Sequence, residues 1–157
     1  MNNLIVVDTR EKGHKKILEY FDQVNQDYIP SKLDAADYMI YKDYSILIDR
    51  KDNIEEICKN LCNKKEHLRI VREIERAKLL GCKRFVFLIQ SPKLPNKDEA
   101  KYKDLNDVCK FWSPYTKIKG ITLYKIMKTF MEHHDCEFMF ATQDKMASTI
   151  IDILTKR

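Results

Sequence analysis

Residues 36–51 read ADYMIYKDYSILIDRK, and this stretch decides the fold. Its two halves, 38–41 and 44–49, are rich in aromatic and β-branched residues, which favour extended strands. Lys42 and Asp43 lie between the halves, where a tight turn is expected. The stretch therefore predicts two neighbouring antiparallel strands joined as a β-hairpin.

The second strand of this hairpin places charge on both faces of the predicted sheet. Because side chains alternate along a strand, Asp49 and Lys51 lie on one face and Arg50 lies on the other. A strict two-residue turn would set Asp37 opposite Ile48, whereas one additional residue sets Asp37 opposite Asp49. We therefore predict a three-residue connection or a β-bulge, because a shared metal ion needs both carboxylates on the same face.

The remaining apolar patterns predict an α/β fold. Residues 4–7 form a continuous apolar run that ends at Asp8, as expected for a buried strand. Residues 84–89 and 137–141 predict two further strands, and a polar segment at 63–67 separates two helical patterns. Hydrophobic periodicity and capping residues predict helices at 17–24, 54–62, 68–77, 105–112, 121–134 and 142–154.

Composition narrows the possible classes of protein. A length of 157 residues and a hydrophobic content of 44% suit a single globular domain over residues 1–157. No apolar segment reaches the length of a membrane span, which predicts a cytoplasmic protein without a membrane partner. The five cysteines lack CxxC spacing and predict reduced, mostly buried thiols rather than a zinc site. A net charge of +5 is a modest excess that favours a polyanionic partner only if lysines surround the functional site.

Asp37, Asp49 and Lys51 form a candidate active site. Mg²⁺ prefers hard oxygen ligands and keeps several waters, so that a few carboxylates suffice to hold it. A metal held in this way neutralises a phosphate and activates water for phosphodiester hydrolysis. Lys51 lies where a cation orients the water or stabilises charge that develops on phosphorus. Alone, the pattern is weak, since an acid two residues before a lysine is common on solvated strands.

Three segments together form a longer pattern. Residues 6–11 read VVDTRE, residues 36–38 read ADY, and residues 49–55 read DRKDNIE. In this order they resemble the opening strand, the Gly-Asp-Tyr motif and the Glu-Arg-Lys-x-x-x-Asp motif of the XPF-type excision-repair nuclease domain. This family belongs to the restriction-endonuclease-like PD-(D/E)xK superfamily, and its later helix, strand and helix layout also resembles the rest of the chain.

Three residues depart from the pattern of that family. Ala36 replaces Gly, Asp49 replaces Glu, and Glu55 replaces Asp. The two acidic replacements preserve charge, although the shorter Asp49 side chain shifts the metal geometry slightly. Ala36 indicates that no positive φ is required at its position.

The resemblance implies a three-layer fold with a central mixed β-sheet flanked by helices. It also implies a metal-dependent DNA endonuclease, with Mg²⁺ or Mn²⁺ as the cofactor and branched or flapped DNA as the substrate. Asp37, Asp49 and the backbone carbonyl of Arg50 would bind the metal, Asp8 would bind it directly or through water, and Lys51 would be the catalytic lysine. Charged side chains would orient this set: Arg10, Glu11, Arg50 and Glu55.

Several of these residues have a structural interpretation as well. Asp8 can cap the helix that follows it, while Glu11 and Glu55 can be ordinary acids of a first helical turn. Arg50 is better explained by structure or phosphate contact than by chemistry. Because all the acids and the lysine are present, the alternative of a non-catalytic DNA-binding scaffold is disfavoured.

Candidate contacts with nucleic acid lie outside the acidic motifs. Lys64 and Lys65, in the polar break, are the first candidates for phosphate contacts, although exposed lysines usually serve solubility. For Arg69, ion pairs on a solvated helix face are the default interpretation, and a DNA contact is the second one. The aromatic residues within 111–115 can stack on a base, form a dimer surface or complete the core, and the core is favoured.

The resemblance leaves substrate and assembly open. A Holliday-junction resolvase of the same superfamily is an alternative, because it would have the same site but a different DNA substrate. A homodimer or a protein partner is compatible with the family. Small stand-alone versions resemble phage or mobile-element proteins, which suggests repair or recombination in a bacterial or phage-infected cell, with the protein on the nucleoid when it binds DNA.

Overall fold

The computed structural model describes residues 3–156 and confirms the α/β class, with a six-stranded mixed sheet as its central layer. The strands are β1 (Ile5–Asp8), β2 (Tyr28–Ser31), β3 (Tyr38–Ile40), β4 (Asp43–Lys51), β5 (Arg84–Ser91) and β6 (Glu137–Thr142). Their order across the sheet is β2-β1-β3-β4-β5-β6. β3 is antiparallel to both of its neighbours, and the other pairs are parallel.

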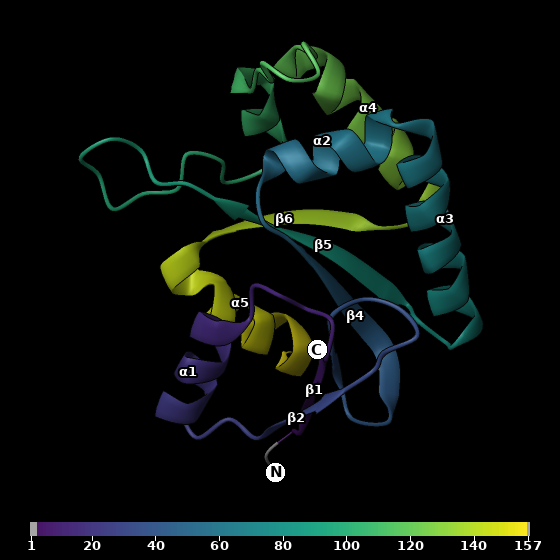
Figure 1. Ribbon diagram of the computed structural model, residues 1–157, viewed down its shortest axis with the longest axis vertical. Helices are drawn as coiled ribbons and strands as arrows, with labels where there is room; N and C mark the ends of the chain where they lie inside the picture. The colour runs from purple at the N-terminus through teal and green to yellow at the C-terminus, as the bar shows by residue number, and fades with distance from the viewer. Residues whose placement is uncertain (1–2, 157) are drawn as a thin grey trace.

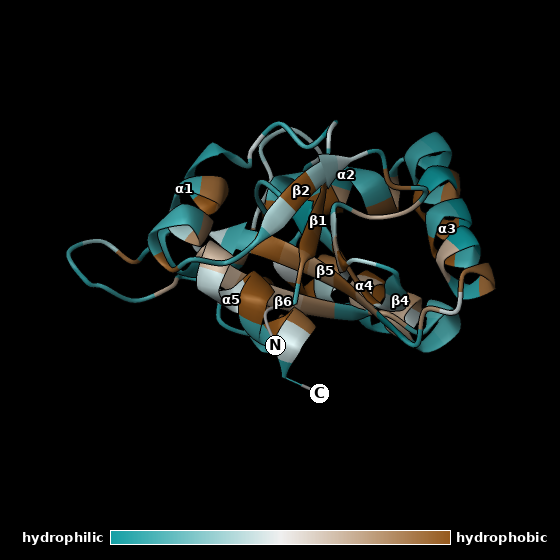
Figure 2. Ribbon diagram, turned by 90° about the horizontal axis from the view of Figure 1, so that it is seen from below, coloured by the Kyte–Doolittle hydropathy of each residue, from teal (hydrophilic) through white to brown (hydrophobic). Residues whose placement is uncertain are grey.

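Helices cover both faces of this sheet (Figure 1). They are α1 (Lys15–Gln23), α2 (Ile54–Cys62), α3 (Lys64–Leu79), α4 (Gly120–His134), α5 (Gln143–Thr155) and the short 3-10 helix η1 (Leu105–Lys110). The helices α2, α3 and α4 pack on one face, and α1 and α5 pack on the other. Figure 2 shows that the central strands are largely hydrophobic, whereas the helices carry both kinds of residue. None of the helices within residues 3–156 is long and apolar enough to cross a membrane.

The β3–β4 hairpin has the bulged register that the shared acidic face requires. Ile40 pairs with Asp43 next to the turn, whereas Tyr38 pairs with Ile48, so β4 advances five residues while β3 advances two. This shift places Asp37 beside Asp49 and confirms the predicted bulge. The side chains of β4 still alternate between the two faces of the sheet, because Leu47 packs in the core on one face and Ile48 packs in the core on the other.

The prediction that Ala36 needs no positive φ was wrong. Ala36 has φ 66°, in the left-handed region, and its side chain is buried. An L-residue there costs roughly 1–2 kcal/mol, which alanine tolerates when its surroundings fix the backbone. The surroundings do so here, because the N–H of Ala36 donates to Glu73 Oε2 at 3.1 Å and the N–H of Asp37 donates to the carbonyl of Ile48.

Two local predictions differ from the structure in the helical layer. The expected polar break at 63–67 is a single residue, Asn63, which ends α2 and also accepts a hydrogen bond from Glu66 N as the N-cap of α3. Lys64 and Lys65 therefore belong to the first turn of α3 and not to a loop. Gly81 follows the end of α3 with φ 99°, a left-handed conformation that favours glycine after a helix.

Other differences concern exposure. β2 was not predicted, because it is an exposed edge strand that contains Pro30 and has no apolar alternation. Phe111 is buried as expected, but Trp112 and Tyr115 are 59% and 78% exposed, so the core assignment was wrong for these two residues. All five cysteines are free thiols, and two of them, Cys62 and Cys109, are exposed rather than buried.

Candidate active site

Three aspartates meet where β1, β3 and β4 lie side by side. The backbone N–H of Asp8 donates to the carbonyl of Asp37, and the N–H of Asp37 donates to the carbonyl of Ile48, both at 2.8 Å. The N–H of Arg50 donates to Asp37 Oδ2, also at 2.8 Å. These bonds hold Asp8 and Asp37 next to the end of β4, and Asp8, Asp37 and Asp49 all line an open pocket of about 900 Å³.

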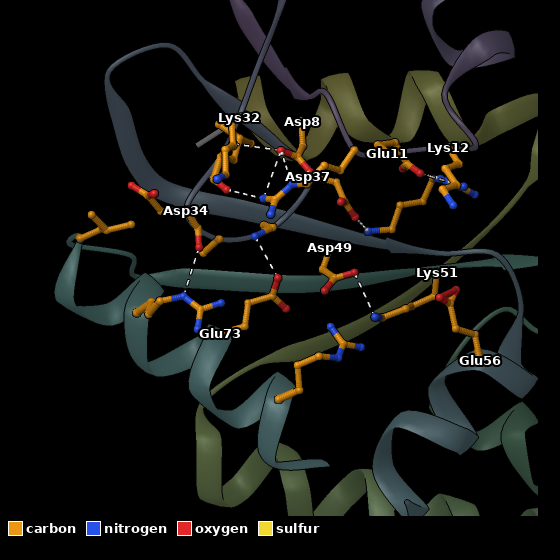
Figure 3. A pocket seen from close by; sticks show the side chains of 18 of the residues that line it. Asp8, Glu11, Lys12, Lys32, Asp34, Asp37, Asp49, Lys51, Glu56 and Glu73 are labelled. Carbon is orange, nitrogen blue, oxygen red and sulfur yellow. Dashed lines mark hydrogen bonds and ion pairs between the residues drawn. The ribbon is translucent and has the colours of Figure 1, made fainter. Parts of the chain in front are cut away.

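Lys51 adds a buried positive charge to this pocket. Its Nζ lies 3.3 Å from Asp49 Oδ1, and both side chains are buried (Figure 3). The same ammonium group lies 5.8 Å from the centroid of the Phe87 ring. Burial alone lowers the pKa of Lys51, but the nearby carboxylates of Asp49, Glu56 and Glu73 outweigh it, so the net shift is upward. Lys51 is therefore a fixed cation beside the aspartates.

Asp37 lies in strongly negative surroundings. Burial raises the pKa of Asp37 well above its ordinary value, and the charge of Asp49 raises it further, with smaller contributions from two glutamates. The hydrogen bond from the backbone of Arg50 opposes this rise without cancelling it. Burial first, and the neighbouring carboxylates second, therefore keep the pKa of Asp37 above its ordinary value.

Glu73 is a member of the site whose role the sequence interpretation missed. It projects from α3 into the pocket and faces Asp49 (Figure 3). Burial raises its pKa well above the ordinary value, and the charge of Asp49 raises it further. A signal was present in the sequence: Glu73, which is half-buried, lies three residues after the buried Ile70 and four before the buried Ala77, on the core-facing side of α3. A charged side chain in a polar helix instead favours a solvated face, as was expected for Arg69.

Asp8 is held by the segment that leads into β3. Its Oδ1 accepts from the backbone N–H of Leu33 at 2.9 Å, and its Oδ2 accepts from Arg10 Nε at 3.2 Å. Arg10 also donates through Nη2 to the carbonyl of Leu33 at 2.7 Å. Asp8 does not cap α1, whose N-cap residue is His14. Arg10 thus holds the carboxylate of Asp8 against the segment that contains Leu33.

Glu11 and Arg50 form a buried ion pair, and both residues are among those that line the pocket. Arg50 Nε donates to Glu11 Oε2 at 2.8 Å, and Tyr38 Oη donates to the same oxygen at 3.2 Å. Glu11 Oε1 accepts from the N–H of Gly13 at 3.0 Å, and Arg50 Nη2 donates to Asp52 at 2.6 Å. The Arg50 side chain extends to the face of β4 opposite Lys51. These contacts tie the loop after β1 to β4, which is a structural task.

The model of the ERCC4 domain matches residues 7–154. The chain belongs to the ERCC4 domain family. No curated protein sequence matches it.

Solved structures show that this ERCC4 domain has the fold of XPF. The structure of XPF from Aeropyrum pernix matches with a TM-score of 0.61 at 17% identity, covering 96% of this chain and 61% of that one. The structure of XPF from Aeropyrum pernix in complex with DNA matches with a TM-score of 0.63 at 18% identity, covering 96% of this chain and 62% of that one. The chain therefore spans about three fifths of these structures.

Only some of the predicted DNA-contacting and orienting residues of this ERCC4 domain lie in the pocket. Arg69 lines the pocket. Lys64 and Lys65 do not line it and are exposed at the start of α3. Glu55 also lies outside the lining, where it accepts from Ser113 Oγ at 2.6 Å and so ties α2 to the segment after η1. Its neighbour Glu56 lines the pocket instead, and accepts from the backbone N–H of Asp52 at 2.8 Å.

The pocket of the ERCC4 domain fits a divalent cation by its chemistry. Within residues 3–156, no three His, Cys, Asp or Glu side chains converge into a metal-binding cluster as they stand. Mg²⁺, however, is commonly held by one or two carboxylates and completes its shell with water. Asp37 and Asp49 offer two such carboxylates, and Glu73 Oε1 is buried without a hydrogen-bond partner in the described structure. A bound cation would offset the cost of burying such a carboxylate oxygen.

Proposed function

We propose that this ERCC4 domain is a metal-dependent DNA endonuclease. The observation that carries the proposal is the set of Asp37, Asp49 and Lys51 in an open pocket, where Asp49 and Lys51 are buried and Asp37 is half-buried. Burying like charges is costly unless the site uses them, and a structural ion pair would need only one carboxylate for the lysine. Two aspartates beside one lysine fit a cation and a phosphate better than they fit a role in stability.

The residues divide the work as follows. Bound Mg²⁺ or Mn²⁺ supplies the chemistry of phosphate neutralisation and water activation. Asp37 and Asp49 hold the cation, and the backbone carbonyl of Arg50 is a further oxygen at the same end of β4. Lys51, protonated and fixed by Asp49, stabilises charge on the reacting phosphate. Asp8 holds the end of β1 in place and binds the cation directly or through water.

DNA is the proposed substrate on two grounds. The pocket has basic residues at its rim, since Arg10, Lys12, Lys32, Arg69 and Arg76 all line it. The similar structure of XPF from Aeropyrum pernix was solved in complex with DNA. We infer phosphodiester hydrolysis that leaves a 5′-phosphate and a 3′-hydroxyl. A preference for branched or flapped DNA, and a homodimer or protein partner, rest on the family resemblance.

The proposal is tested with labelled duplex, flap, splayed-arm and four-way-junction DNA, each in Mg²⁺, Mn²⁺ or EDTA. Asp49→Asn and Lys51→Met remove the two charges at nearly constant shape. Glu19→Gln and Lys15→Met are matched controls, because both residues are exposed on α1, on the other side of the sheet from α3. Metal-dependent cleavage by the wild type and the controls, lost in the two site variants, is the expected result.

Two other outcomes would select the rival functions. Binding of branched DNA without cleavage in any metal would support a non-catalytic scaffold. Cleavage confined to four-way junctions, with symmetric cuts, would support a Holliday-junction resolvase.

A further inference from the structure

Glu73 has one carboxylate oxygen fixed and the other one free. Oε2 accepts the backbone N–H of Ala36 at 3.1 Å. Oε1 is buried and has no hydrogen-bond partner among residues 3–156. No ion pair joins Glu73 to a lysine or arginine in this part of the chain, although Lys51 and Arg69 line the same pocket.

A buried carboxylate oxygen without a donor has an energetic cost, and the side chain that faces it, Asp49, can form a hydrogen bond with it only through a shared proton. Leaving a buried acceptor unsatisfied costs about 1–3 kcal/mol, and more when the group is charged. The cost rises because Glu73 faces Asp49, which is itself buried (Figure 3). Two carboxylates facing one another repel unless a proton or a cation lies between them.

The backbone holds Glu73 in this orientation. Ala36 adopts its left-handed conformation immediately before Asp37, and its N–H is the donor to Glu73. The strained residue therefore links α3 to the strand that carries a proposed metal ligand. Strain of this kind is found where a site needs a fixed geometry.

We propose that Glu73 is a third carboxylate of the cation site, with Oε1 binding the divalent ion opposite Asp49 and Oε2 held by Ala36. The proposal rests on the proposed function for the presence of a divalent ion, but it does not require that DNA be cut. It assigns to α3 a direct part in the metal site, in addition to β3 and β4. Asp49 and Glu73 would then hold the cation from opposite walls of the pocket.

The test is Mn²⁺ binding without DNA, measured by electron paramagnetic resonance and by isothermal titration calorimetry at pH 8. Glu73→Gln keeps the shape and an acceptor for Ala36, but it removes the charge and the ligand oxygen. Glu75→Gln, exposed on the same helix, is the matched control. We expect Glu73→Gln to weaken Mn²⁺ binding by about tenfold or more, the scale seen when a metal site loses a supporting contact, and Glu75→Gln to leave it unchanged.

The outcomes separate this proposal from the proposed function. Unchanged Mn²⁺ affinity in Glu73→Gln would overturn the assignment even if the wild type cuts DNA, and so would a wild type that binds no Mn²⁺. Weakened binding would support it even if no DNA is cut. Thermal unfolding in EDTA guards against a purely structural effect, because the assignment requires that metal-free Glu73→Gln be at least as stable as the wild type.

Discussion

The buried pair of Glu11 and Arg50 gives a prediction that separates structure from catalysis. Glu11→Gln replaces a carboxylate that accepts from Arg50, Tyr38 and Gly13 with an amide, and it leaves the guanidinium without its buried anion. The side chains of Arg50 and Glu11 are 4% and 7% exposed, so water cannot replace the lost partner. Asp52 continues to pair with Arg50.

The magnitude follows from this geometry. Removing one partner of a buried ion pair costs about 3–5 kcal/mol, and the remaining contact with the exposed Asp52 places the loss at the lower end, about 3 kcal/mol. For a chain of this size, that loss lowers Tm by roughly 6–12 °C. Because the Arg50 side chain lies on the face of β4 opposite Lys51, the folded variant is expected to retain cleavage within about tenfold of the wild type.

The assay combines thermal unfolding in EDTA with cleavage at 20 °C, with Glu19→Gln on α1 as the exposed control. The double variant Glu11→Leu with Arg50→Met should recover much of the lost stability, since an apolar replacement removes both buried charges. A Tm within 2 °C of the wild type would refute the structural role. A stable, folded Glu11→Gln that no longer cuts DNA would show that Glu11 acts in the chemistry instead.

Three further predictions concern pH, DNA contact and packing. Burial and neighbouring carboxylates raise the pKa of Asp37 and Glu73 in the folded state. Above about pH 4, the folded state therefore binds more protons than the unfolded state. The free energy of unfolding in EDTA should fall as pH rises through the raised pKa values. Urea unfolding at pH 5 and pH 8 tests this, and an equal slope in Glu73→Gln would contradict it. Arg69→Ala should weaken DNA binding and reduce the slope of log affinity against log salt concentration by about one. Lys64→Ala should have less effect on both quantities. Fluorescence anisotropy across a salt series measures them. A Cβ at Gly13 would lie 1.7 Å from a guanidinium nitrogen, so Gly13→Ala should lower Tm by displacing the buried ion pair, and an unchanged Tm would argue against that pair.

The hairpin and its acidic face follow from local rules. Alternation along β4 fixes the sides of Asp49 and Lys51, and the demand for two carboxylates on one face predicts the bulge that sets Asp37 beside Asp49. Asp8 joins them because β1 pairs with β3. These features depend on a period of two and on short-range pairing, which the sequence expresses directly.

Features that depend on tertiary contacts were out of reach of the sequence. The left-handed backbone of Ala36 is held by contacts with residues far along the chain, among them the bond from its N–H to Glu73. Glu55 turns away to Ser113, while its neighbour Glu56 faces the pocket, since one residue of a helix changes direction by about 100°. The exposed edge strand β2 has no core-facing pattern to detect.

The central claim is that Asp49 and Lys51 act on a phosphodiester through a divalent cation. Single-turnover cleavage of a labelled flap, with enzyme in excess, tests it most directly, because binding and product release then do not limit the rate. We predict that Lys51→Met lowers this rate by about 100-fold or more while DNA affinity stays within a few-fold, and that EDTA abolishes cleavage by the wild type. Cleavage by Lys51→Met at the wild-type rate, or undiminished cleavage in EDTA, would contradict the account.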